Sequence, residues 1–97
     1  MFSDNRNYKF YDCLVQNYIW EEDTNTIILS CQYLDRGVTR IALKGVCDSS
    51  CLEILFNHVI EYVVSSYDEG KKACCYEIHL KKMSETAKVW AESMEFL

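Results

Sequence analysis

The side chains best suited to chemistry are cysteines and a histidine in the middle of the chain. Cys47 and Cys51 have C-x3-C spacing, and His58 follows on the C-terminal side. Closely spaced thiolates with an imidazole are the ligand types of structural zinc. A thiolate beside a histidine base is also the arrangement of nucleophilic cysteine catalysis. These three residues define one hypothesis, a small Cys/His metal-binding or redox protein.

The spacing of the other reactive residues weakens that hypothesis. Cys74 and Cys75 are adjacent, and neighbouring residues on a strand point to opposite faces, so they form no second ligand pair. If Cys51 began a helix, His58 would lie about 10 Å along its axis, too far for direct proton transfer. We therefore predict that the chain is not an enzyme and holds neither a metal nor another cofactor.

Carboxylates form the second pattern, because they gather in short polar stretches between apolar segments. Such clusters can bind calcium or act as an acid/base pair, but their spacing is not that of an EF-hand loop. Acidic turns also attract a basic partner and accelerate its association. The stretches contain Glu21, Glu22 and Asp23, then Asp35, then Asp68 and Glu69.

Aromatic residues are more numerous than one small core can cover, with seven Tyr and two Trp in 97 residues. Tyr and Trp are enriched at protein interfaces. Tyr18 and Trp20 lie just before the first acidic stretch, so this segment is a candidate partner surface or dimer seam. A small core is marginal, which favours a homodimer or a homo-oligomeric structural protein as further possibilities.

Length and charge restrict the class of protein. The chain suits one domain, 1–97. Ten basic and fifteen acidic residues give a formal charge of −5, which argues against nucleic acid as the partner. The sequence contains no run of 18 apolar residues, so no membrane span is expected. A polar N-terminus without a secretory pattern and cysteines in apolar stretches indicate free thiols in the cytoplasm.

The apolar pattern predicts an antiparallel meander in the first half of the chain. Residues 8–20 are aromatic and β-branched, 26–34 alternate between apolar and polar side chains, and 38–46 repeat that alternation. Period-two alternation is typical of half-buried strands. The polar stretch at 21–25 and the turn before Gly37 join the three predicted strands.

The second half of the chain allows two interpretations. Asp48, Ser49 and Ser50 resemble a helix N-cap, yet the β-branched run at 59–64 favours a strand. We predict a mainly β fold, an antiparallel meander of five to six strands with one short helix around 50–56. The alternative is α+β, a four-stranded antiparallel sheet with a helix at 49–66 and a C-terminal helix over 86–97.

Several short motifs follow one another along the chain. They are Phe10-Tyr11-Asp12, the aromatic strand ending at Trp20, residues 40–46, residues 57–61 and residues 91–96. This succession resembles a group of small, acidic, β-rich, uncharacterised bacterial cytosolic proteins, some of which are proposed to be immunity proteins of polymorphic toxin systems. The resemblance implies strands for 59–65 and for the tail, and transfers no catalytic residue, since members often carry His where Tyr11 stands.

Together these observations predict a non-catalytic protein-binding module. In its sharpest form, it is an immunity-type inhibitor whose acidic surface covers a basic, nucleic-acid-facing surface of a toxin. The expected contact residues are Glu21, Glu22, Asp23, Asp35, Asp68, Glu69, Trp20 and Tyr18.

Overall fold

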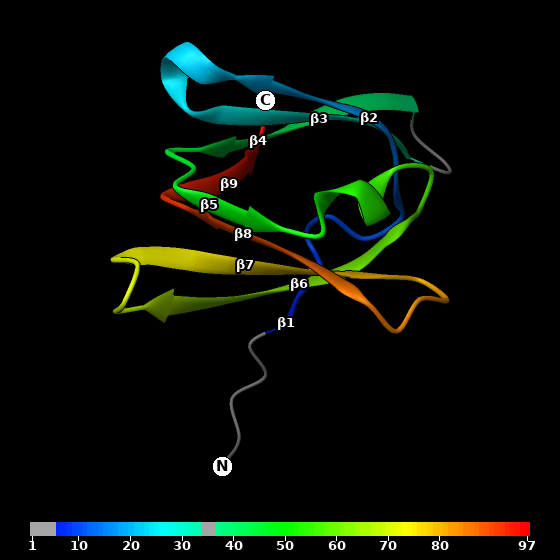
Figure 1. The fold of residues 1–97 in the computed structure, drawn as a ribbon. Helices are drawn as coiled ribbons and strands as arrows, with labels where there is room; N and C mark the ends of the chain where they lie inside the picture. Colours follow the sequence, from blue (N-terminus) through cyan, green and yellow to red (C-terminus); the bar gives the residue numbers. More distant parts are fainter. Residues whose placement is uncertain (1–5, 34–36) are drawn as a thin grey trace.

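The chain folds into two antiparallel β-sheets that lie in two layers (Figure 1). The computed structural model describes residues 6–33 and 37–97, and within them the helical segments are two short 3-10 turns. The elements are β1 (Arg6–Asn7), β2 (Cys13–Glu21), η1 (Glu22–Thr24), β3 (Thr26–Tyr33), β4 (Gly37–Lys44), β5 (Asp48–Ser50), η2 (Leu52–Leu55), β6 (Ile60–Asp68), β7 (Ala73–Leu80), β8 (Thr86–Ala91) and β9 (Ser93–Phe96).

One sheet has five strands and the other has four. The five-stranded sheet has the order β1-β6-β7-β8-β5, and the four-stranded sheet has the order β2-β3-β4-β9. In Figure 1 the four-stranded sheet is the upper layer. The chain passes between layers after β1, β4 and β8, so each sheet combines distant segments. The predicted mainly β fold is confirmed, with more strands in the described residues than the five or six expected.

The predicted meander is confirmed as β2, β3 and β4, which pair in consecutive order, although β2 begins at Cys13 and not at Tyr8. In β3, Ile27, Leu29 and Cys31 are buried, while Ile28 and Ser30 between them are half-buried on the other face. This is the period-two alternation that the sequence showed, and it turns one face of the sheet toward the core. The polar stretch after β2 forms η1, as expected for a turn.

The alternative helix at 49–66 is wrong, because this segment contains β5, η2 and β6. Asp48 and Ser50 do not cap a helix. They pair with Trp90 and Lys88 of β8, which satisfies the backbone groups of β5 from another part of the chain. The predicted short helix around 50–56 is a 3-10 turn, η2, which begins after Cys51 in the left-handed conformation (φ 61°).

The alternative C-terminal helix is also wrong, since the tail forms β8 and β9. β8 pairs with β7 in the five-stranded sheet, and β9 pairs with β4 in the four-stranded sheet. Ala87, Val89 and Ala91 are buried at period two, whereas a helix would have buried a three-to-four-residue stripe. The tail therefore joins the two layers.

The core lies between the two sheets and is apolar. Phe10 is 1% exposed and packs in a tilted arrangement against Phe96, with 4.9 Å between ring centroids, which fixes the segment that enters β2. No helix in the described ranges is long and apolar enough to cross a bilayer. Other fully buried side chains are Cys13, Val15, Ile27, Leu29, Cys31, Ile41, Leu43, Leu55, Ile60, Ile78, Ala87, Val89 and Ala91.

Candidate functional site at the acidic end

Four connections between strands meet at one end of the molecule, on the left in Figure 1. They are the β2–β3, β4–β5, β6–β7 and β8–β9 connections. Backbone hydrogen bonds hold three of them together: the Val46 N–H donates to the Asn25 carbonyl at 2.8 Å, and the Glu92 N–H donates to the Lys44 carbonyl at 2.8 Å. We call this surface the acidic end, and its charged residues are named below.

The first predicted acidic stretch forms an exposed hairpin tip. Glu21 ends β2, and Glu22 and Asp23 lie in η1, all three with exposed side chains. Asn25 closes the tip in the left-handed conformation (φ 49°), which Asn tolerates better than most residues. The Thr24 hydroxyl lies 3.5 Å from a Glu21 carboxylate oxygen. The tip therefore presents its carboxylates to solvent, as expected.

The second predicted pair divides into two different roles. Glu69 is exposed in the turn, but Asp68 is half-buried and helps to build it. Asp68 accepts hydrogen bonds from the Lys71 backbone N–H at 3.2 Å and from the Trp90 indole N–H at 2.9 Å. These bonds, the backbone one first, lower the pKa of Asp68 below 3.8. Asp35 lies outside the described residues.

Sequence reasoning missed one cluster at this end, in which Lys71 contacts both β5 and β8 of the five-stranded sheet. The Lys71 ammonium lies 2.6 Å from an Asp48 carboxylate oxygen and 4.8 Å from the centre of the Trp90 ring. The hydrogen bond from Lys71 lowers the pKa of Asp48 and raises that of Lys71. In the sequence, Asp48 resembles a helix N-cap. Its contact with Lys71 joins residues far apart in the chain, so no local signal indicates this cluster.

Carboxylates outnumber lysines at the acidic end, and the excess accounts for most of the chain's formal charge of −5. Two of the lysines are paired, Lys71 with Asp48 and Lys44 with Glu95 at 2.8 Å. The field at this end is therefore negative. The carboxylates are Glu21, Glu22, Asp23, Asp48, Asp68, Glu69 and Glu92, and the lysines are Lys44, Lys71 and Lys72.

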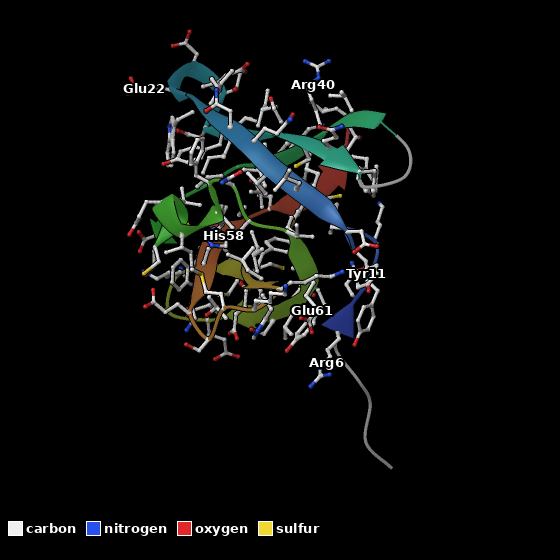
Figure 2. The ribbon with its side chains drawn as sticks, turned by 90° about the vertical axis from the view of Figure 1, so that its right-hand side faces the viewer. Arg6, Tyr11, Glu22, Arg40, His58 and Glu61 are labelled. Carbon is white, nitrogen blue, oxygen red and sulfur yellow. The ribbon has the colours of Figure 1, made fainter. Side chains whose placement is uncertain are left out.

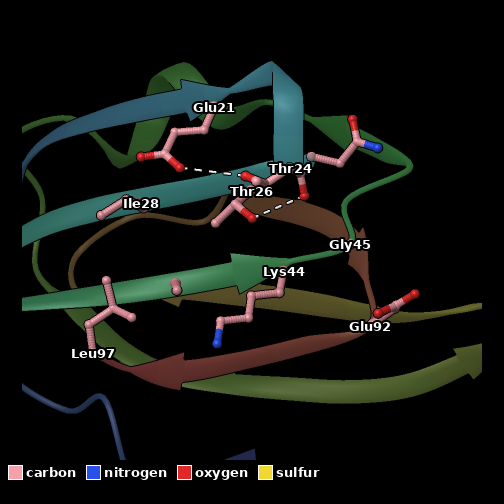
Figure 3. A pocket seen from close by; sticks show the side chains of 10 residues that line it. Glu21, Thr24, Thr26, Ile28, Lys44, Gly45, Glu92 and Leu97 are labelled. Carbon is pink, nitrogen blue, oxygen red and sulfur yellow. Dashed lines mark hydrogen bonds between the residues drawn. The ribbon is translucent and has the colours of Figure 1, made fainter.

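An open hollow of about 640 Å³ adjoins the hairpin tip on the outer face of the four-stranded sheet (Figure 3). Ile28 contributes apolar surface from β3 and Leu97 adds more from the C-terminus, while the buried Ala42 of β4 lies beneath them. Glu21 lines the hollow from β2, and Lys44 lines it from β4. The hollow is thus a mixed apolar and charged surface beside the carboxylates, and its shape is concave.

The two predicted aromatic contact residues lie on β2 beside this tip. Trp20 is 41% exposed, whereas Tyr18 is half-buried and packs against the core cluster. They pair with Ile27 and Leu29 of β3, which are buried, so both rings point to the inner face of the sheet. Trp20 is exposed because it lies near the end of that face.

The three residues of the metal or redox hypothesis are not brought together. Cys47 and Cys51 flank β5 on either side, and four residue steps of extended chain separate their Cα atoms by about 13 Å. The His58 ring is 3.0 Å from the Phe56 carbonyl oxygen. In residues 6–33 and 37–97 no group of three or more His, Cys, Asp or Glu side chains could hold a metal ion.

The acidic end is suited to attraction rather than to a buried reaction. Its carboxylates are exposed or hydrogen-bonded in their ionised form, and an ionised array acts on cations over a Debye length of about 8 Å at physiological salt. Comparison with known proteins finds no matching family model, no similar curated protein and no similar solved structure.

Proposed function

We propose that this chain is a non-catalytic protein-binding module that docks its acidic end on a basic surface of a partner protein. The observation that carries the proposal is the convergence of exposed carboxylates from separate turns, with Glu22 and Asp23 at the tip of a rigid hairpin. Charge arranged on one surface accelerates encounter and selects partners of opposite charge.

The resemblance to immunity-type proteins supplies the sharper form of this proposal. Such an inhibitor occupies the basic groove of a toxin that would otherwise bind nucleic acid, and its carboxylates take the place of phosphates. The hollow beside Glu21 then receives a long basic side chain of the partner, whose aliphatic stem would lie on Ile28. In this form the protein acts in the cytoplasm, where the toxin would act.

The test begins with affinity capture from the source lysate in reducing buffer at low salt. The captured protein is then purified, and its dissociation constant is measured for two triple variants that carry the same change in net charge. One variant reverses the three negative charges of the hairpin tip (Glu21→Lys, Glu22→Lys, Asp23→Lys). The other reverses Glu53, Glu61 and Glu85, which lie outside the acidic end.

We expect the tip variant to weaken binding at least about 100-fold, since close charge pairs at interfaces contribute more than 1.5 kcal/mol each. The control variant should retain most of the affinity, because only long-range charge has changed. Binding of the unmodified protein should fall steeply with salt. An affinity that is insensitive to the tip, or equally sensitive to both variants, contradicts docking through the acidic end.

A further inference from the structure

The edges of the two sheets differ in how well they are protected. β1, β5 and β9 are edge strands of two, three and four residues. β2 is the remaining edge strand and has nine residues. A long edge strand presents unpaired backbone N–H and C=O groups, to which another strand can add. β2 is therefore the place in the fold where strand addition is easiest.

The N-terminal part of β2 is covered by the chain itself. The Val15 N–H donates to the His58 carbonyl at 2.9 Å, and the Asn57 N–H donates to the Val15 carbonyl at 2.8 Å. This coverage ends at a register shift between Val15 and Asn17. Beyond it, β2 pairs with β3 on one side, and no described residue pairs with 17–21 on the other.

Apart from the register shift at its start, the open stretch has few of the devices that usually protect an edge. It contains no Lys, Arg or Pro, and its one charged residue is Glu21 at the end. Ile19 is 54% exposed and Trp20 is 41% exposed. Five residues of strand span about 17 Å, which is enough for a short ladder.

One hydrogen bond indicates which backbone groups face outward. The Tyr18 N–H donates to the side-chain oxygen of Asn17 at 2.8 Å, so it is directed away from β3. Hydrogen-bonding direction alternates along an antiparallel strand, and Trp20 therefore faces outward as well. Ile19, between them, directs its backbone groups toward β3. The outward groups thus belong to Tyr18 and Trp20.

We propose that this edge pairs with the same edge of a second copy of the chain, antiparallel about a two-fold axis at Ile19. Tyr18 of each copy then lies opposite Trp20 of the other, and these pairs exchange four backbone hydrogen bonds. Ile19 meets its counterpart as a closely spaced apolar pair. The two four-stranded sheets become one continuous eight-stranded sheet.

Charge and polarity also match in this register. Glu21 of one copy lies opposite Asn17 of the other, whose side-chain NH2 group can donate to the carboxylate. No pair of like charges faces across the axis. The pairing uses the backbone groups of Tyr18 and Trp20, so the inference does not depend on the proposed function of the acidic end.

The contact is small, so the dimer is weak. A five-residue ladder offers few contacts beyond its four backbone hydrogen bonds, so we expect a dissociation constant in the micromolar range or above. Sedimentation equilibrium from about 10 µM to 1 mM in reducing buffer covers that range. Ile19→Lys sets two ammonium groups against each other at the axis, whereas Val38→Lys makes the same change at an exposed position on β4 (77%).

We expect the unmodified protein and Val38→Lys to dimerise and Ile19→Lys to lose at least 10-fold in dimer affinity. Unchanged circular dichroism confirms that the variants fold. A protein that stays monomeric throughout overturns the proposal, as does a dimer that Ile19→Lys leaves intact, because that dimer would use another surface.

Amide hydrogen exchange on the unmodified protein tests the register itself. Raising the concentration through the dimerisation range should slow exchange at Tyr18 and Trp20 and leave Ile19 unchanged, because its N–H already bonds to β3. Exchange at Tyr18 and Trp20 that is independent of concentration would refute the pairing.

Discussion

Gly45 allows a close approach between two connections of the acidic end, and replacing it provides a sharp test of that geometry. Its φ is +66°, and a Cβ placed there would lie 2.6 Å from both Cγ and Cδ of Glu92. Gly37 has a φ of +91°, but a Cβ there would meet nothing within 4 Å. Alanine at Gly37 therefore adds backbone strain alone, whereas alanine at Gly45 adds strain and a collision.

The two costs can be separated by magnitude. A left-handed backbone costs an L-residue about 1–2 kcal/mol, and the lower entropy of the unfolded Ala chain offsets about 0.4–1 kcal/mol of it. Gly37→Ala should thus lower the free energy of unfolding by about 1 kcal/mol. Gly45→Ala should lower it by about 2 kcal/mol, since the exposed Glu92 side chain must also leave its rotamer at about 1 kcal/mol.

Urea unfolding followed by tryptophan fluorescence measures this difference. With an m-value of about 1 kcal/mol per molar, the midpoints should fall by about 1 M and 2 M respectively. Glu92→Ala removes both carbons that the new Cβ meets, so Gly45→Ala should cost only about 1 kcal/mol in that background. Equal losses for Gly37→Ala and Gly45→Ala, or a Gly45→Ala penalty unaffected by Glu92→Ala, would refute the reasoning.

Three further outcomes follow from the core and the titrating groups. Phe10→Ala should lower the free energy of unfolding by about 3–5 kcal/mol in urea titrations, because the ring is fully buried. Burial raises the pKa of Cys31 to about 12, so a thiol titration of the native protein at neutral pH should label the exposed Cys47 and leave Cys31 unmodified. The lowered pKa of Asp68 gives stability that is complete above its ordinary value of 3.8 and is lost as pH falls through the lower folded-state pKa. Asp68→Asn should therefore flatten the acid limb of the stability profile measured by urea unfolding.

Local pattern was enough to predict the meander but not the second layer. β2, β3 and β4 follow one another in sequence and in the sheet, and their side chains alternate, so period and turn residues locate them. β5 has no such signal. Asp48, Ser49 and Ser50 favour a helix start by themselves, and they form a strand because β8, 40 residues later, provides its hydrogen bonds.

The candidate site was also predictable only in its local part, the acidic hairpin tip. Glu21, Glu22 and Asp23 were identified because three consecutive acids in a turn are exposed wherever the hairpin packs. The contacts of Asp48 with Lys71 could not be found, because they depend on how β5 and the β6–β7 turn meet across the sheet. The role of Asp68 in its own turn was missed for a related reason, since the indole that binds it comes from β8.

Two cations outside the acidic end contact neighbouring side chains, whereas the carboxylates of the hairpin tip are exposed. Lys81 lies 4.2 Å from the centre of the Tyr11 ring and pairs with Asp12, and the Arg6 guanidinium lies over the Tyr62 ring. In Figure 2 Arg6 lies at the opposite end of the molecule from the hairpin tip that carries Glu22. The negative end is thus available to a partner, while these positive groups already have neighbours.

Salt should therefore act mainly on the association rate of a basic partner and much less on its dissociation rate, because screening weakens the approach more than the contacts already formed. Stopped-flow measurements at two salt concentrations would show this, and a salt effect confined to dissociation would exclude steering by the acidic end.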